Sequence, residues 1–281
     1  MAGDVTKESA MAGTGRVASR TALVMGAGQT PGQTTGNGRA TAVLLAREGA
    51  KVLCADRDLA AAEETVTQIA DEGGEAFAIG ADVTVEDEVA AAVAACVQQW
   101  GRLDILHNNV GISIAGGDAS VADIEAEAFA LITAVNLQGM VMTCKHAIRV
   151  MRGQDSGGVI TNISSIAAQI NYPYVTYRTS KAGVVTLTEH IAITNAQYGI
   201  RANAILPGLM DTPMAIENRV GLDGRTREDV YAERNSHVPL RNKMGTAWDV
   251  ANAALFLASE EAAFITGVAL AVDGGQSLAS G

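Results

Sequence analysis

The stretch TALVMGAGQTPGQTTGNG, residues 21–38, decides the fold of this chain. It joins a short apolar run to a cluster of glycines, and an amphipathic segment at 37–49 follows. This order predicts a buried strand, a tight turn and a helix. Glycines let the backbone approach a pyrophosphate, and a helix N-terminus offers free N–H groups, so the flanking elements favour a dinucleotide-binding turn over a plain tight turn. The residues expected at the phosphates are Gly26, Gly28, Gly36, Asn37 and Gly38.

Short apolar runs and longer amphipathic stretches alternate outward from this turn. The predicted strands are 21–25, 51–55, 75–81, 103–107, 158–163, 200–206 and 268–272, and the predicted helices are 37–49, 59–73, 85–100, 175–198 and 247–258. A β-α-β order implies parallel strands with helices on both faces of one sheet. The expected fold is α/β, a single-domain Rossmann-type doubly wound parallel sheet of about seven strands. It occupies residues 16–281, after a flexible tail at 1–15.

The composition limits the partners that we expect. The chain has 281 residues and a formal net charge of -11, which argues against a nucleic-acid partner because phosphate backbones bind basic surfaces. Three cysteines without metal-ligand spacing indicate no metal site and a reducing, cytoplasmic location. No apolar run of about 18 residues is apparent, so no membrane span is expected.

Acidic residues end the second and third predicted strands. A carboxylate at Asp56 is placed to accept the ribose hydroxyls of NAD and to repel the 2′-phosphate of NADP. Arg57 beside it offers a partner to that phosphate, so NAD is the expected cofactor and NADP the less favoured one. Asp82, followed by Val83, either contacts the adenine or caps the next helix.

Tyr177 and Lys181 lie four positions apart on a predicted helix and therefore share a face. A free tyrosine has a pKa of about 10, and an adjacent ammonium favours its phenolate form. The pair therefore suggests an acid/base tyrosine, although a surface pair at helical spacing is the alternative. Ser164 and Ser165 end the strand just upstream and offer a hydroxyl to a substrate oxygen, and Asn136 is a polar residue within an apolar helix.

Residues 209–240 interrupt the alternation of strands and helices. The segment is polar and mixed, and it follows a strand at the edge of the sheet where open α/β sheets bind ligands. We interpret it as a substrate lid, and a solvated excursion is the alternative.

Taken together, these motifs resemble the short-chain dehydrogenase/reductase family, in its compact single-domain branch. The resemblance extends from about residue 16 to the C-terminus. It rests on the glycine turn, ADV at 81–83, NNVG at 108–111, VNLQG at 135–139, NISS at 162–165, YRTSK at 177–181, PG at 207–208 and VDGG at 272–275.

The resemblance implies a catalytic tetrad of Asn136, Ser165, Tyr177 and Lys181. Tyr177 would exchange the proton with the substrate oxygen, Ser165 would orient that oxygen, Lys181 would lower the tyrosine pKa and bind the nicotinamide ribose, and Asn136 would hold a water. Asn108 would line the cofactor cleft. The further cofactor contacts that it implies are Asn109, Val110, Gly111, Pro207, Gly208 and Thr212. A homotetramer is also implied.

Three departures from the family pattern are visible. Met25 replaces a threonine, Val110 replaces an alanine, and about six extra residues within 29–35 lengthen the glycine turn. The insertion either folds over the adenosine or bulges into water. We expect an NAD-dependent oxidoreductase that interconverts a secondary alcohol and a ketone, both small molecules. The alternatives are an NADPH-dependent 3-oxoacyl reductase and a non-catalytic NAD-binding sensor or scaffold.

Overall fold

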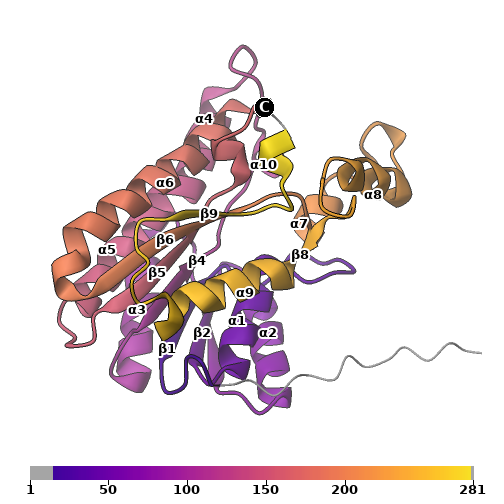
Figure 1. Ribbon diagram of the computed structural model, residues 1–281. Helices are drawn as coiled ribbons and strands as arrows, with labels where there is room; N and C mark the ends of the chain where they lie inside the picture. Colours follow the sequence, from indigo (N-terminus) through magenta and orange to yellow (C-terminus); the bar gives the residue numbers. More distant parts are fainter. Residues whose placement is uncertain (1–14, 280–281) are drawn as a thin grey trace, which may run out of the picture.

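Seven parallel strands form the centre of the computed structural model, which describes residues 15–279 (Figure 1). Their order across the sheet is β3-β2-β1-β4-β5-β6-β9, so the chain starts in the middle and winds outward in both directions. The strands are β1 (Thr21–Met25), β2 (Lys51–Asp56), β3 (Ala76–Gly80), β4 (Ile105–Asn108), β5 (Gly158–Ile163), β6 (Ile200–Pro207) and β9 (Ala269–Val272). The predicted fold class, a doubly wound parallel sheet, is confirmed.

Helices cover both faces of this sheet. The helices α1 (Asn37–Arg47), α2 (Leu59–Asp71) and α9 (Ala247–Ala258) pack on one face. The opposite face carries α3 (Glu86–Trp100), α5 (Gly139–Met151) and α6 (Val175–Asn195), with α4 (Ala126–Thr133) leading into α5. Every residue of β1, β4 and β5 is buried, which explains why these strands are short apolar runs without alternation.

The helix and strand boundaries follow the sequence closely, with two local differences. The predicted helix at 175–198 ends at Asn195 and continues as a 3-10 turn, Ala196–Tyr198. Asn136, expected on a helix, lies on a π-helical turn, Ala134–Gln138, that joins α4 to α5. Such single turns are rare and occur frequently at functional sites.

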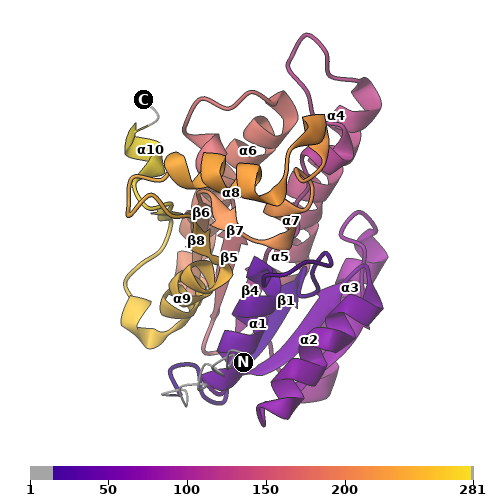
Figure 2. The ribbon, with the colours of Figure 1, turned by 90° about the vertical axis from the view of Figure 1, so that its right-hand side faces the viewer.

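Residues 209–240 are partly helical, and we keep the name lid for them. They contain β7 (Met210–Asp211), α7 (Pro213–Ile216) and α8 (Arg227–Ser236), and β7 pairs with β8 (Gly245–Thr246) after the lid. The helix α8 projects away from the main sheet in Figure 1 and lies in front of the strand ends in Figure 2. The short helix α10 (Gln276–Ala279) follows β9. The expected tail at 1–15 falls almost wholly outside the described residues.

One continuous helical stretch, Ala126–Met151, is long and apolar enough to cross a membrane by length and composition alone. Asn136 and Gln138 interrupt it, so it holds no unbroken apolar run of about 18 residues. Met140, Cys144 and Ala147 of this stretch are buried in a core cluster that also contains residues of α3 and α6. A third of its most apolar window is buried, and core helices of folded domains have the same composition.

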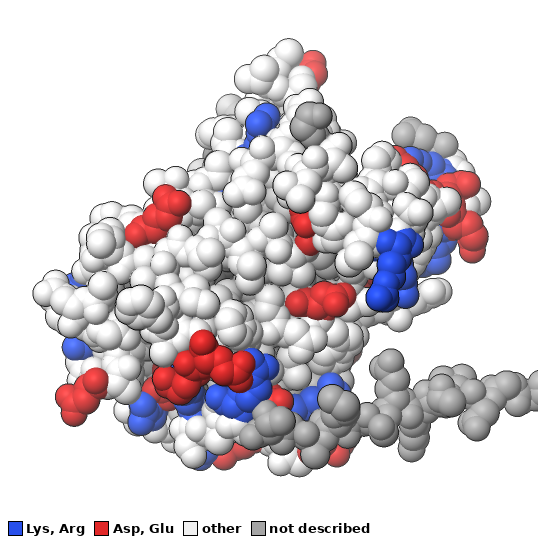
Figure 3. All heavy atoms as spheres, in the orientation of Figure 1, with Lys and Arg blue, Asp and Glu red and all other residues white. Residues whose placement is uncertain are grey.

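Charged side chains are unevenly distributed on the face shown in Figure 3. They gather along the edge near α9 and the start of β1 and over the lid, while the centre of this face is largely uncharged. Several are paired across elements, such as Arg16 with Glu261.

Candidate active site

The glycine turn brings the N-terminus of α1 against the end of β1. Gly26 adopts a φ of +80°, a conformation that other residues rarely adopt. A Cβ at Gly38 would lie 1.8 Å from the Gly26 carbonyl oxygen, so helix and turn touch backbone to backbone. The Asn109 side chain donates to the same carbonyl at 3.1 Å. These contacts fix the turn at the carboxyl edge of the sheet.

The extra residues 29–35 are exposed at 30–33 but contact the lid. Gln29 closes the base of the insertion by accepting a hydrogen bond from the Gly36 backbone at 2.9 Å. The tip of the insertion contacts the lid, since a Cβ added at Gly32 would lie 2.8 Å from the Cβ atom of Pro213. The Gln33 backbone N–H bonds the Glu217 carboxylate, and Glu217 pairs with Arg227. The insertion therefore connects the glycine turn to α7 and α8.

The turn has the features that a dinucleotide requires. The Asn37 Oδ1 atom is buried at the start of α1 without a hydrogen-bond partner among the described residues. Such an atom is costly unless a ligand or water satisfies it. Asp56 accepts hydrogen bonds from the Gly28 backbone at 3.0 Å and the Asp58 backbone at 3.1 Å. The residues present thus fit a bound dinucleotide.

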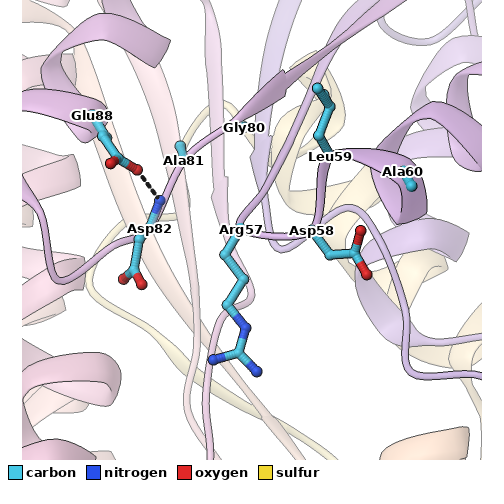
Figure 4. A pocket seen from close by; sticks show the side chains of 8 residues that line it. All are labelled: Arg57, Asp58, Leu59, Ala60, Gly80, Ala81, Asp82 and Glu88. Atoms are coloured by element: carbon cyan, nitrogen blue, oxygen red, sulfur yellow. Dashed lines mark hydrogen bonds between the residues drawn. The ribbon is translucent and has the colours of Figure 1, made fainter.

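An open cavity of about 840 Å³ lies beside Asp56, at the ends of β2 and β3 (Figure 4). Arg57 extends into the space between Asp58 and Asp82. Asp82 accepts hydrogen bonds from both the backbone and the hydroxyl of Thr84, which lower the pKa of its carboxyl. Asp82 thus stabilises the turn before α3, but it does not cap that helix, whose N-cap is Val85. Its contact with the adenine stays a prediction.

Tyr177, Ser165 and Lys181 converge at the same edge of the sheet. Ser165 follows β5, and its hydroxyl hydrogen-bonds that of Tyr177. Lys181 is buried, with its Nζ atom 5.6 Å from the Tyr177 ring centre and donating to the Ile163 carbonyl at 2.9 Å. Ser164, the other serine considered, is buried and donates to the Lys181 carbonyl at 2.7 Å. Ser165 is therefore the serine that faces the reacting group.

Burial dominates the ionisation of Tyr177 and Lys181. Desolvation raises the pKa of Tyr177 to about 12, although the Ser165 hydrogen bond and the Arg219 charge lower it. Burial lowers the pKa of Lys181 to about 8, and its ammonium donates to the Ile163 carbonyl. That Lys181, together with the nicotinamide charge, lowers the tyrosine pKa stays a prediction.

The Asn136 side chain forms two hydrogen bonds with the backbone of the segment after β4. Its side chain accepts from the Ile112 N–H and donates to the Ile112 carbonyl, both at 2.8 Å, and also donates to Ser180. The side chain is thus committed to protein groups, and a water held by Asn136 stays a prediction. A Cβ at Gly111 would lie 3.0 Å from the Lys181 Nζ atom, so glycine at this position keeps that ammonium accessible.

The remaining predicted cofactor residues lie along the same edge. Val110 contacts Gly26, Gly208 follows β6 after Pro207, and Thr212 begins α7. Val83 is buried at a small cavity beneath Val110. Asn108, expected to line the cleft, instead donates to Asn162 at 2.9 Å and to Cys144 within the core. Asn108 ends β4, a strand in which every residue is buried, so its amide is hydrogen-bonded within the core.

Two residues near Tyr177 escaped the sequence analysis. The buried Asp118 accepts hydrogen bonds from the Thr176 and Tyr177 backbones and so holds the first turn of α6. Arg219 of the lid acts electrostatically on Tyr177. Both are distant in sequence, and neither belongs to a local motif that would have marked it.

Comparisons with known proteins agree with this geometry. A family model described as Enoyl-(Acyl carrier protein) reductase matches residues 32–277. Cis-4-hydroxycyclohexanecarboxylate dehydrogenase of Sinomonas cyclohexanicum is 37% identical over 259 residues, covering 92% of this chain and 96% of that protein. 2-(S)-hydroxypropyl-CoM dehydrogenase 3 of Xanthobacter autotrophicus is 36% identical over 243 residues, covering 86% and 92%. A crystal structure of a short-chain dehydrogenase/reductase from Burkholderia xenovorans superposes with a TM-score of 0.87 at 37% identity, covering 94% and 98%.

Proposed function

The chain belongs to the short-chain dehydrogenase/reductase family, and from that premise we propose that it is an NAD-dependent enzyme that interconverts a small secondary alcohol and a ketone. One observation carries this proposal: the Tyr177 hydroxyl is hydrogen-bonded to Ser165 beside the glycine turn, with Lys181 buried one helical turn away. A sensor or scaffold would have no use for an acid/base pair at this position. Relatives named for hydroxy compounds support the substrate class.

The chain's own residues supply the proton chemistry. The Ser165 hydroxyl orients the substrate oxygen, and the Tyr177 phenol donates its proton to that oxygen when a ketone is reduced. In the reverse direction the phenolate accepts the alcohol proton. Because desolvation raises the pKa of Tyr177 to about 12, the protonated form dominates at neutral pH and favours reduction until a nearby positive charge is added. When bound, the cofactor would donate the hydride as NADH in reduction and accept it as NAD in oxidation, and its oxidised form would add that charge.

Replacement of the tyrosine tests this assignment. We expect Tyr177→Phe to lower turnover at least about a thousandfold, since general acid–base catalysis contributes about that much. NADH binding, followed by fluorescence, should stay near the wild-type level. Tyr174→Phe is the matched control, because Tyr174 stacks edge-on against Tyr172 at 5.6 Å without reaching Ser165. Unchanged turnover in Tyr177→Phe would exclude the mechanism.

Asp56 supports NAD as the preferred cofactor over NADP. Its carboxylate stands at the Gly28 backbone, where a ribose would lie, and adds a negative charge that repels a 2′-phosphate. Titrating NADH and NADPH in parallel measures the preference. We expect NADH to bind about tenfold or more tightly, and Asp56→Ser to reduce this ratio. Tighter binding of NADPH would instead favour a 3-oxoacyl reductase, with Arg57 holding the phosphate.

The oligomeric state and location are further proposals. Apolar side chains on α4 and α6 are exposed in the single chain, including Phe129, Leu131 and Ile193. A homotetramer would cover such surface, and light scattering after gel filtration measures it. The buried free thiols of Cys54, Cys96 and Cys144 support a reducing, cytoplasmic location.

A further inference from the structure

The lid carries two arginines, Arg219 and Arg234, that have no carboxylate oxygen within 4.0 Å among residues 15–279. Seven arginines have such a partner: Arg16, Arg20, Arg39, Arg47, Arg102, Arg225 and Arg227. Among the described residues outside the lid, six more lack one: Arg57, Arg149, Arg152, Arg178, Arg201 and Arg241. The other two lid arginines, Arg225 and Arg227, are both paired.

Arg234, on α8, is buried with 8% of its surface exposed. Its guanidinium donates to the Met244 sulfur at 3.3 Å and the Met210 carbonyl at 3.4 Å, both neutral and weak acceptors. A guanidinium has five donors, and burying it without an anion is costly. Accordingly, burial lowers the pKa of Arg234 to about 10.

Arg219 acts electrostatically on both Arg234 and the catalytic tyrosine. It follows α7 and donates to the Ala215 carbonyl at 2.8 Å, which uses one of its donors. Its charge lowers the pKa of Arg234 and contributes to lowering the pKa of Tyr177. The two guanidiniums therefore repel each other, and Arg219 is near enough to Tyr177 for its charge to act on the phenol.

The carboxylates closest to this space are committed elsewhere. Asp211 accepts the Tyr231 hydroxyl at 2.7 Å, and Glu233 pairs with Arg225. Asp118 accepts backbone hydrogen bonds at the start of α6. These three charges moderate the repulsion, but none of them lies within 4.0 Å of either guanidinium.

We propose that Arg219 and Arg234 bind the carboxylate of the substrate, so that the enzyme acts on hydroxy acids and their keto acids. The inference rests on the proposed function and narrows its substrate class. Guanidinium forks match the two oxygens of a carboxylate, and binding them removes the repulsion between the arginines. The acid group is held by the lid, and the alcohol carbon is thereby directed to Tyr177 and Ser165.

Matched substrate pairs test this assignment. The probes are 3-hydroxybutanoate, 4-hydroxypentanoate and 5-hydroxyhexanoate, each beside its carboxamide, with NAD reduction followed by absorbance. We expect kcat/KM to be at least about tenfold higher for the acid than for the amide at one chain length. Arg219→Met and Arg234→Met should remove that preference, so that kcat/KM becomes similar for the acid and the amide of one chain length. Arg225→Met, in the same lid but paired with Glu233, should keep the preference.

A binding measurement separates this inference from the proposed function. Hexanoate, which has no hydroxyl, should raise the melting temperature of the wild-type protein saturated with NADH, and should not do so for Arg219→Met. If no alcohol is oxidised but hexanoate binds through Arg219, the proposed function fails and the anion site stands. If acids and amides react equally in the wild type, or hexanoate binds equally to both proteins, the anion site is wrong. Arg234→Lys provides a folded alternative should Arg234→Met not fold.

Discussion

Replacing Lys181 by methionine should make the protein more stable at neutral pH while abolishing its activity. Lys181 is buried with 2% of its surface exposed, and its ammonium has one hydrogen-bond acceptor, the Ile163 carbonyl at 2.9 Å. Methionine fills a similar volume without a charge. The substitution therefore removes an ammonium that the catalytic site needs but that lowers the free energy of unfolding.

The magnitude follows from the pKa. Burial lowers the pKa of Lys181 from 10.5 to about 8. A shift of that size corresponds to about 3 kcal/mol of unfavourable interaction with the charged form. Loss of the hydrogen bond to Ile163 offsets about 1 kcal/mol of the gain. We therefore expect Lys181→Met to unfold with a free energy about 2 kcal/mol higher than the wild type at pH 7.

The pH dependence has a definite sign. Below pH 8 both the folded and the unfolded chain carry the charge, so the full cost is present. Between pH 8 and 10.5 the folded chain releases its proton first, and the cost declines. The advantage of Lys181→Met should thus shrink by about 2.5 kcal/mol between pH 7 and pH 10.

Urea unfolding without cofactor, at fixed protein concentration, measures this difference at each pH. The matched control is Lys145→Met, which removes an ammonium from a half-exposed position on α5 beside Glu86. We expect Lys145→Met to give no stabilisation at pH 7. If Lys181→Met were no more stable than the wild type at pH 7, or if its advantage did not change with pH, the reasoning about the buried charge would be refuted.

Three further outcomes are expected. Gly38→Ala should abolish NADH binding or folding, as judged by fluorescence titration and circular dichroism, because its Cβ would lie 1.8 Å from a carbonyl oxygen. Gly32→Val should raise the KM for NAD about threefold or more by separating the insertion from Pro213, whereas the exposed Thr30→Val should not. Burial lowers the pKa of His107 to about 3, so the unfolded chain binds a proton first as the pH falls below 6.5. His107→Leu should therefore lose about 3 kcal/mol less stability than the wild type between pH 7 and pH 4 in urea titrations.

The sequence predicted the parts of the fold that local patterns control. The strands β1 and β5 and the helix α9 begin and end where apolar runs and glycines place them. The π-helical turn at Asn136 was not predictable in the same way, since it depends on the contact with Ile112, 24 positions upstream. The inward orientation of Asn108 likewise depends on Asn162 in a neighbouring strand.

In the candidate site, too, local patterns were predictable and features set by distant contacts were not. The motif spacing identified Tyr177 and Lys181, because both lie on one helix face. The extent of their desolvation was not predictable from that spacing, since it is set by how the surrounding elements pack. Arg234 carried no sequence signal, because a polar lid segment gives no reason to expect a buried charge.

The two buried charges of the site lie in apolar cores of different size: Lys181 beside the sheet and Arg234 in the lid. Lys181 lies on α6, which packs in the large apolar core against the sheet. The many apolar contacts of that core offset the unfavourable free energy of burying the Lys181 charge. Arg234 lies on α8, whose buried core consists of Ile216, Val230, Val238 and Met244. That cluster is much smaller than the core against the sheet, and each of its buried apolar side chains contributes about 1.5–3 kcal/mol. A substrate carboxylate bound to Arg234 would add the counter-charge that the lid lacks. The same contact that selects the substrate would then also stabilise the lid around it.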